Sequence, residues 1–122
     1  MDIPKIHVEF KLDANGKPIC ITRGDKNHYK LVLSVVGVPE DTHAVTYQLH
    51  ESYYDPTREV RRGEAGFPEE ITSYGDYAIA ARVRQKSSST VVKTILTKAL
   101  SDTYKDAGNE EIQRAISELQ QY

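Results

Sequence analysis

Cysteine is almost absent from this sequence of 122 residues. Cys20 is the only one, so the chain cannot form an internal disulfide, and a reducing compartment is expected. Cys20 lies between two isoleucines in an apolar run, which predicts a strand and a buried, unreactive thiol.

Long apolar runs and an excess of one charge are also missing. No run approaches the ~18 apolar residues that a membrane-spanning helix needs, and the N-terminus lacks the apolar segment of a signal peptide. The formal net charge is only −2, so no global attraction to nucleic acid or to an anionic membrane is expected. We therefore expect a cytoplasmic protein that binds neither nucleic acid nor membrane.

Signatures of catalysis and of metal binding are missing as well. The chain has no glycine-rich phosphate loop, nucleophile elbow or zinc-protease motif. The four histidines are too scattered to suggest a metal site: they are His7, His28, His43 and His50. Acidic pairs such as Glu69 and Glu70 are more simply explained as solvated than as an acid–base pair. We expect no enzymatic activity, no metal and no cofactor.

What the sequence does contain is alternation of apolar and polar residues with a period of two, which is typical of half-buried strands. Turn signals such as Asn15-Gly16 separate the alternating segments about every 8–12 residues, a spacing that favours a β-sandwich or barrel. The expected strands cover residues 6–12, 19–23, 29–36, 44–50, 57–61, 66–72, 77–83 and 90–100. We predict an all-β fold.

The last residues change to a helical period. Ile112, Ile116 and Leu119 fall at i, i+4 and i+7, and Asn109 is a suitable N-cap. Such a short helix must pack its apolar stripe on something. Its own sandwich, a second copy and a region beyond this sequence all remain possible. We expect residues 1–104 to form the sandwich domain and residues 105–122 a helical extension.

Tyrosines gather where two strands are expected to end. Tyr53 and Tyr54 follow the strand at 44–50, and Tyr74 follows the strand at 66–72. A tyrosine in a loop exposes a flat π-face that can hold an alkyl chain, a cation or another planar group. Tyrosines also cap the open end of a sandwich core, so both interpretations stay open at this point.

Two segments resemble the sequence markers of the YEATS domain family. Residues 45–53, Val-Thr-Tyr-Gln-Leu-His-Glu-Ser-Tyr, resemble that family's strand ending in His-Leu-His-Glu/Pro-Ser-Phe. Residues 69–77 resemble its turn of the type Gly-Tyr/Trp-Ala/Gly-x-Phe before a strand. Upstream, residues 28–31 resemble its His-x-Trp segment, and Gly37 matches the glycine that ends that strand. The resemblance covers about residues 5 to 100.

YEATS domains are immunoglobulin-like β-sandwiches, so the resemblance implies such a sandwich of about eight strands, here with one C-terminal helix. Eukaryotic members read acylated lysine on histone tails by sliding the acyl chain between two aromatic rings. By motif position, Tyr53 and Tyr74 would form these rings and Ser52 would bond the acyl amide. The ligand-binding residues that the resemblance implies are His50, Ser52, Tyr53, Ser73, Tyr74 and Gly75.

Departures from the eukaryotic pattern resemble the prokaryotic branch of the family. Ser73 stands where the family usually has glycine, which would narrow the pocket or limit the approach of the backbone. Residues 24–27, before His28, contain no aromatic residue. Prokaryotic members are associated with signalling and with predicted defence proteins.

The sequence leaves two candidate functions for this chain. The first is a non-catalytic recognition module that binds a modified, acyl-lysine-like peptide or a small ligand in an aromatic pocket, as the sensor part of a signalling or defence protein. The alternative is a structural or protein-interaction domain without a ligand pocket. Its protein partner, or a second copy, would bind the stripe of Ile112, Ile116 and Leu119 or a sheet edge.

Overall fold

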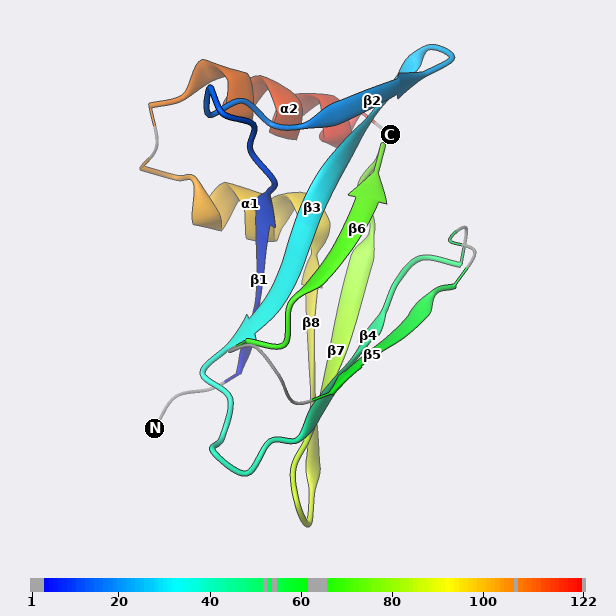
Figure 1. Cartoon of the computed structure of the whole chain (residues 1–122), viewed down its shortest axis with the longest axis vertical. Helices are drawn as coiled ribbons and strands as arrows, with labels where there is room; N and C mark the ends of the chain where they lie inside the picture. Colours follow the sequence, from blue (N-terminus) through cyan, green and yellow to red (C-terminus); the bar gives the residue numbers. More distant parts are fainter. Residues whose placement is uncertain (1–3, 52, 54, 62–65, 107, 122) are drawn as a thin grey trace.

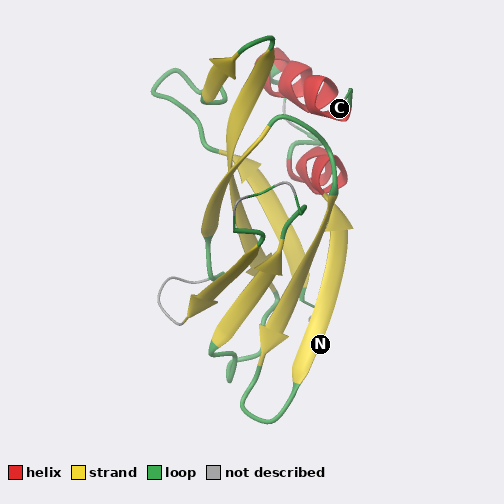
Figure 2. Ribbon diagram, turned by 90° about the vertical axis from the view of Figure 1, so that its right-hand side faces the viewer, coloured by secondary structure: helices red, strands yellow, loops and turns green. Residues whose placement is uncertain are grey.

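The computed structural model, which describes residues 4–51, 53, 55–61, 66–106 and 108–121, contains two antiparallel sheets and two helices (Figures 1 and 2). The first sheet consists of β1 (Lys5–Phe10), β2 (Cys20–Arg23), β3 (Lys26–Val36) and β6 (Glu69–Ser73). The second consists of β4 (Ala44–Gln48), β5 (Thr57–Arg61), β7 (Ala78–Arg84) and β8 (Ser89–Ile95). The helices, α1 (Leu96–Thr103) and α2 (Glu110–Gln120), lie together at one end.

The strand order is that of an immunoglobulin-like sandwich. β3 pairs with β1 and β6 in one sheet, and the other sheet has the order β5-β4-β7-β8. By their positions along the chain, β1, β3 and β6 correspond to strands A, B and E of immunoglobulin domains. In the other sheet, β5, β4, β7 and β8 correspond to strands C′, C, F and G. The predicted all-β, immunoglobulin-like sandwich of eight strands is confirmed.

The long strand β3 shows how the apolar pattern fixes the register of the first sheet. Every second residue from Tyr29 to Val35 is buried, and the residues between them are partly exposed. Leu31 pairs with Phe10 on β1 and with Ile71 on β6, and all three side chains belong to the core. A shift of one residue would turn this whole apolar face to solvent.

The sequence prediction is wrong at residues 96–100, which were expected to continue a strand. β8 ends before Leu96, where α1 begins. Leu96, Ala99 and Leu100 are spaced i, i+3 and i+4, and all three are buried. This spacing turns one face of a helix toward the core, but the β-branched residues just before it favoured a strand. The fold therefore has two C-terminal helices and not one.

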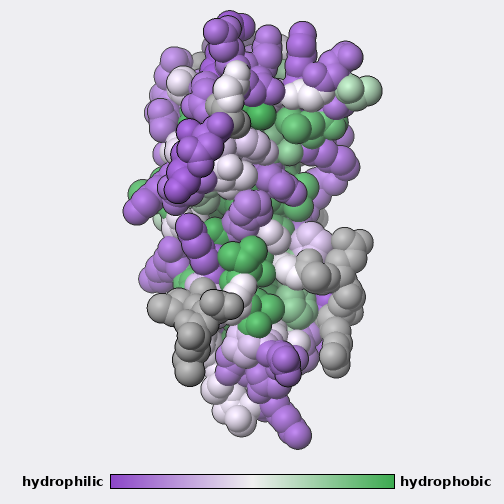
Figure 3. Space-filling model, turned by 90° about the vertical axis from the view of Figure 1, so that its left-hand side faces the viewer, coloured by the Kyte–Doolittle hydropathy of each residue, from purple (hydrophilic) through white to green (hydrophobic). Residues whose placement is uncertain are grey.

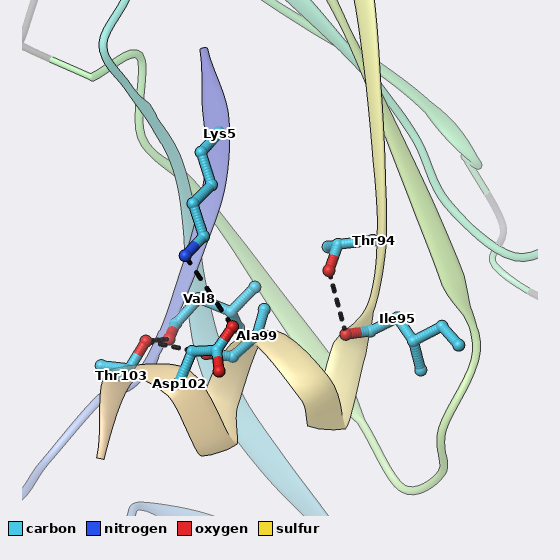
Figure 4. Close-up of polar contacts among 7 residues, drawn as sticks. All are labelled: Lys5, Val8, Thr94, Ile95, Ala99, Asp102 and Thr103. Atoms are coloured by element: carbon cyan, nitrogen blue, oxygen red, sulfur yellow. Dashed lines mark hydrogen bonds and ion pairs between the residues drawn. The ribbon is translucent and has the colours of Figure 1, made fainter. Parts of the chain in front are cut away.

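α1 covers the outer edge of β1 (Figure 4). The hydroxyl oxygen of Thr103 lies 2.7 Å from the carbonyl oxygen of Val8. Nearby, Lys5 Nζ lies 3.8 Å from the carboxylate of Asp102. An uncovered strand edge presents unpaired backbone groups to other chains. The helix that the sequence did not predict thus caps part of the outer edge of β1.

α2 packs its apolar stripe against its own sandwich. Ile112, Ile116 and Leu119 are 3%, 3% and 0% exposed and belong to the same core as the strands. The predicted N-cap is confirmed, because Asn109 Oδ1 accepts two backbone N–H groups of the first turn. The stripe is therefore not available to a partner or a second copy, which corrects the predicted interaction surface.

The end of α2 is tied to the hairpin of β2 and β3. The carboxylate of Glu118 accepts hydrogen bonds from Asn27 Nδ2 at 2.7 Å and from the Tyr29 hydroxyl at 3.0 Å. Burial, with the hydrogen bond and charge of Glu118, raises the pKa of Tyr29 to about 12. These two hydrogen bonds hold the start of β3 against the end of α2.

The surface differs from the sequence expectation at one position. Cys20 is exposed, as are all four residues of β2, so the expectation of a buried thiol is wrong.

On the face shown in Figure 3, apolar atoms gather near the middle and hydrophilic atoms dominate both ends. Neither described helix is long and apolar enough to cross a membrane.

Candidate functional site

The predicted aromatic residues follow the ends of β4 and β6, which point toward the same end of the sandwich in Figure 1. Tyr53 follows β4, and Tyr74 and Tyr77 lie between β6 and β7. His28 near the start of β3 and His50 after β4 contact these tyrosines. We call this group of five residues the aromatic end.

Tyr53 and Tyr77 form the half-buried part of the aromatic end. Their ring centroids are 5.6 Å apart at an interplanar angle of 68°, an edge-to-face arrangement. The Tyr53 hydroxyl donates to the carbonyl oxygen of Thr72 at 2.6 Å and also contacts the Tyr77 hydroxyl. Burial is the largest cause that raises the pKa of both tyrosines. Tyr53 is thereby fixed against the edge of β6.

Tyr74 forms the exposed part of the aromatic end. It is 40% exposed, and its ring centroid lies 4.9 Å from that of His28. The pairing of Tyr29 with Ser73 brings His28 and Tyr74 opposite each other at the end of the sheet. Lys26 Nζ lies 4.6 Å from the Tyr74 centroid, within the range of a cation–π interaction. His28 and Lys26 thus both contact the Tyr74 ring, and the flexible side chain of Lys26 lies over its π-face.

The turn that carries Tyr74 is held by polar contacts at both ends. Ser73 is 3% exposed, and its hydroxyl donates to the carbonyl oxygen of Gly75 at 2.8 Å. The Asp76 carboxylate accepts the backbone N–H of Thr97 at 3.0 Å and the Thr97 hydroxyl at 2.7 Å. Asp76 thus satisfies an otherwise unpaired N–H in the first turn of α1. Ser73, predicted to contact ligand, here shapes the turn.

The segment after β4 places the other predicted residues. His50 is exposed, and its ring centroid lies 5.7 Å from that of Tyr77. Ser52, predicted to bond the acyl amide, lies outside the described residues. Tyr53 and Tyr74 contact different aromatic partners, so a two-ring sandwich around a ligand stays a prediction.

A cavity of about 390 Å³ adjoins the aromatic end. Tyr53 lines it, as does His28, the residue that contacts Tyr74. The remaining lining residues come from β2, β5 and β6 and are Ile21, Arg23, Arg58, Glu70, Ile71 and Thr72. The cavity is large enough for a modified side chain together with part of a peptide.

Sequence reasoning missed several residues of this site. The sequence pattern placed Tyr77 only at the start of the expected strand at 77–83, and Arg58 only within the expected strand at 57–61. His28 was quoted for the family resemblance but not as a site residue. Its contact with Tyr74 joins residues far apart in the chain, so only the pairing of β3 with β6 reveals it.

Comparisons with known proteins bear on this site. Residues 27–93, more than half of the chain, match the family described as the prokaryotic YEATS domain. The matched stretch contains His28, Tyr53 and Tyr74 but neither helix. No curated protein sequence matches significantly.

The solved structures that resemble this chain distantly include two of Yaf9. One is the Yaf9 YEATS domain recognising a succinylated histone H3 peptide, with 12% identity, a TM-score of 0.47, and coverage of 96% of this chain and 94% of the other. The second is the yeast AF-9 homologue Yaf9, with 16% identity, a TM-score of 0.42, and coverage of 96% and 88%. The family assignment rests on the match over residues 27–93.

Proposed function

Because this chain belongs to the prokaryotic YEATS domain family, we propose that it is a recognition module that binds an acyl-lysine-like modified peptide, or a small ligand with a similar acyl group, at the aromatic end. We further propose that it recognises its ligand without catalysis and serves as the sensor part of a signalling or defence protein. The single observation that carries the proposal is the exposed ring of Tyr74, presented by a fixed turn beside the cavity.

The chemistry of acyl-lysine suits these surroundings. Acylation removes the lysine charge and leaves a flat, polarisable amide that stacks on an aromatic face. Tyr74 offers such a face at its exposed side, and Tyr53 contributes a half-buried ring to the adjoining cavity. The buried amide needs hydrogen bonds, which the Ser52 hydroxyl and backbone groups at Tyr74 and Gly75 would supply by family resemblance.

The alternative, an interaction domain without a ligand pocket, has less support. Its predicted surface on α2 is buried in the core, and part of the edge of β1 is covered by α1. The aromatic end, by contrast, combines an exposed ring and an adjoining cavity.

Replacing Tyr74 by alanine tests the proposal. We expect Tyr74→Ala to weaken binding of an acetyl- or crotonyl-lysine peptide about tenfold or more, because it removes a stacking face. Because Tyr74 is an exposed residue, the melting temperature should change little. Isothermal titration calorimetry measures the affinity, and a thermal melt checks the fold.

Two matched variants complete this experiment. Tyr74→Phe keeps the ring and should keep most of the affinity. Val91→Ala removes an exposed apolar side chain from β8, in the other sheet, and should leave binding unchanged. An affinity that Tyr74→Ala leaves intact would contradict the proposed site.

A further inference from the structure

The cavity beside the aromatic end is lined by two arginines from different sheets. Arg23 is the last residue of β2, and Arg58 lies on β5. Arg58 is held in place, because its Nε donates to the carbonyl oxygen of Asp55 at 2.7 Å. Two arginines therefore line the space into which a ligand would extend from the aromatic end.

The nearby carboxylates balance these charges only in part. Glu70 lines the cavity, but its carboxylate lies 3.0 Å from Lys11 Nζ. Glu69 reaches Arg58 only at 4.0 Å, the outer limit of an ion pair. Asp25 lies two residues after Arg23 in the sequence but does not line the cavity. Lys26 adds a further positive charge beside Tyr74.

We infer that the cavity binds an acidic side chain of the peptide, next to the modified lysine that the aromatic end holds. This inference rests on the proposed function and narrows its ligand class to acyl-lysine in an acidic sequence. In an extended peptide, residues two apart lie about 6.6 Å from each other on the same face. An acidic residue two positions from the modified lysine therefore reaches toward Arg23 or Arg58, whereas a basic residue there is repelled.

Three peptides that differ only in their flanking residues test the inference. Each carries a crotonyl-lysine, which has no charge of its own, and at positions −2 and +2 either glutamate, alanine or lysine. We expect the glutamate peptide to bind about fivefold more tightly than the alanine peptide at low ionic strength, and the lysine peptide more weakly. Added salt should reduce the difference, because it screens exposed charges.

Charge reversal identifies the residues responsible. The double variant Arg23→Glu and Arg58→Glu should lose or invert the preference for the glutamate peptide over the lysine peptide. Arg82→Glu is the matched control, because Arg82 is an exposed arginine on β7 and does not line the cavity. It should keep the preference of the native protein.

The outcomes separate this inference from the proposed function. If all three peptides bind equally, or the lysine peptide binds best, the charge preference is wrong and the acyl-lysine site stands. If the double variant keeps the preference for glutamate, the assignment to Arg23 and Arg58 is wrong. If no peptide binds, the proposed function fails and the inference fails with it.

Discussion

Raising the pH above 10 is expected to unfold this protein over a narrow pH range. Burial raises the pKa of five tyrosines above the ordinary value of 10, namely Tyr29, Tyr47, Tyr53, Tyr77 and Tyr104. Tyr47 shows the cause most clearly. Its side chain is fully buried, and its hydroxyl donates to the carbonyl oxygen of Phe67 at 2.6 Å. Ionisation would place a charge in the core and break this bond.

The direction of the change in stability depends on whether the folded or the unfolded chain binds the tyrosine proton more strongly. A tyrosine with a raised pKa in the folded state binds its proton more strongly there than in the unfolded chain. Its contribution to stability is complete below pH 10 and is lost as the pH rises through the folded pKa, which for Tyr29 is about 12. Between pH 10 and that value, Tyr29 lowers the free energy of unfolding by about 1.4 kcal/mol per pH unit. The other four tyrosines act in the same direction.

Absorbance at 295 nm and far-UV circular dichroism, recorded together against pH, check this prediction. The absorbance of these five tyrosinates should rise in the same pH interval in which the β-sheet signal is lost. Return to neutral pH should restore both signals. Complete ionisation of the tyrosines near pH 10 with an unchanged dichroism spectrum would show that they are not buried in this way.

Leu119→Ala is expected to destabilise the fold by about 2–5 kcal/mol, because it opens a cavity under α2. Leu119 is fully buried and packs in the same core as the strands. The control is Ser117→Ala, at an exposed position of the same helix, which should change the stability by less than about 0.5 kcal/mol. Urea denaturation of the two variants and the native chain measures the difference.

The same experiment tests the predicted division of the chain at residues 104 and 105. If α2 is part of one cooperative fold, the loss at Leu119 lowers the midpoint of a single transition seen by every probe. If Leu119→Ala melts only the helix and leaves the sheet signal at its native midpoint, residues 105–122 are a separable extension.

Much of the fold could be predicted from the sequence because strand alternation is a local signal. The apolar positions of β3 occur at every second residue, and the buried side chains of the sheet follow them. α1 escaped prediction because Leu96, Ala99 and Leu100 follow a β-branched run without a break. The exposure of Cys20 also could not be predicted, since it depends on which part of the first sheet the second sheet covers.

The candidate site was predictable only in part, for a different reason. Motif positions singled out Tyr53 and Tyr74, and both lie at the aromatic end. The contact of His28 with Tyr74 depends on long-range pairing between β3 and β6. The cavity depends on where β2 and β5 lie relative to β6. No local pattern in the sequence specifies these distances.

The central claim is that the aromatic end binds an acyl-lysine-like ligand, and an NMR titration tests it most directly. ¹⁵N-labelled protein is titrated with acetyl-, crotonyl- and succinyl-lysine peptides, and with the unmodified lysine peptide as the control. We expect an acylated peptide to shift the backbone signals of His28, Tyr53, Tyr74 and Gly75, and the unmodified peptide to leave them in place. If none of the acylated peptides moves these signals, the tyrosines serve only to cap the core and the claim is wrong.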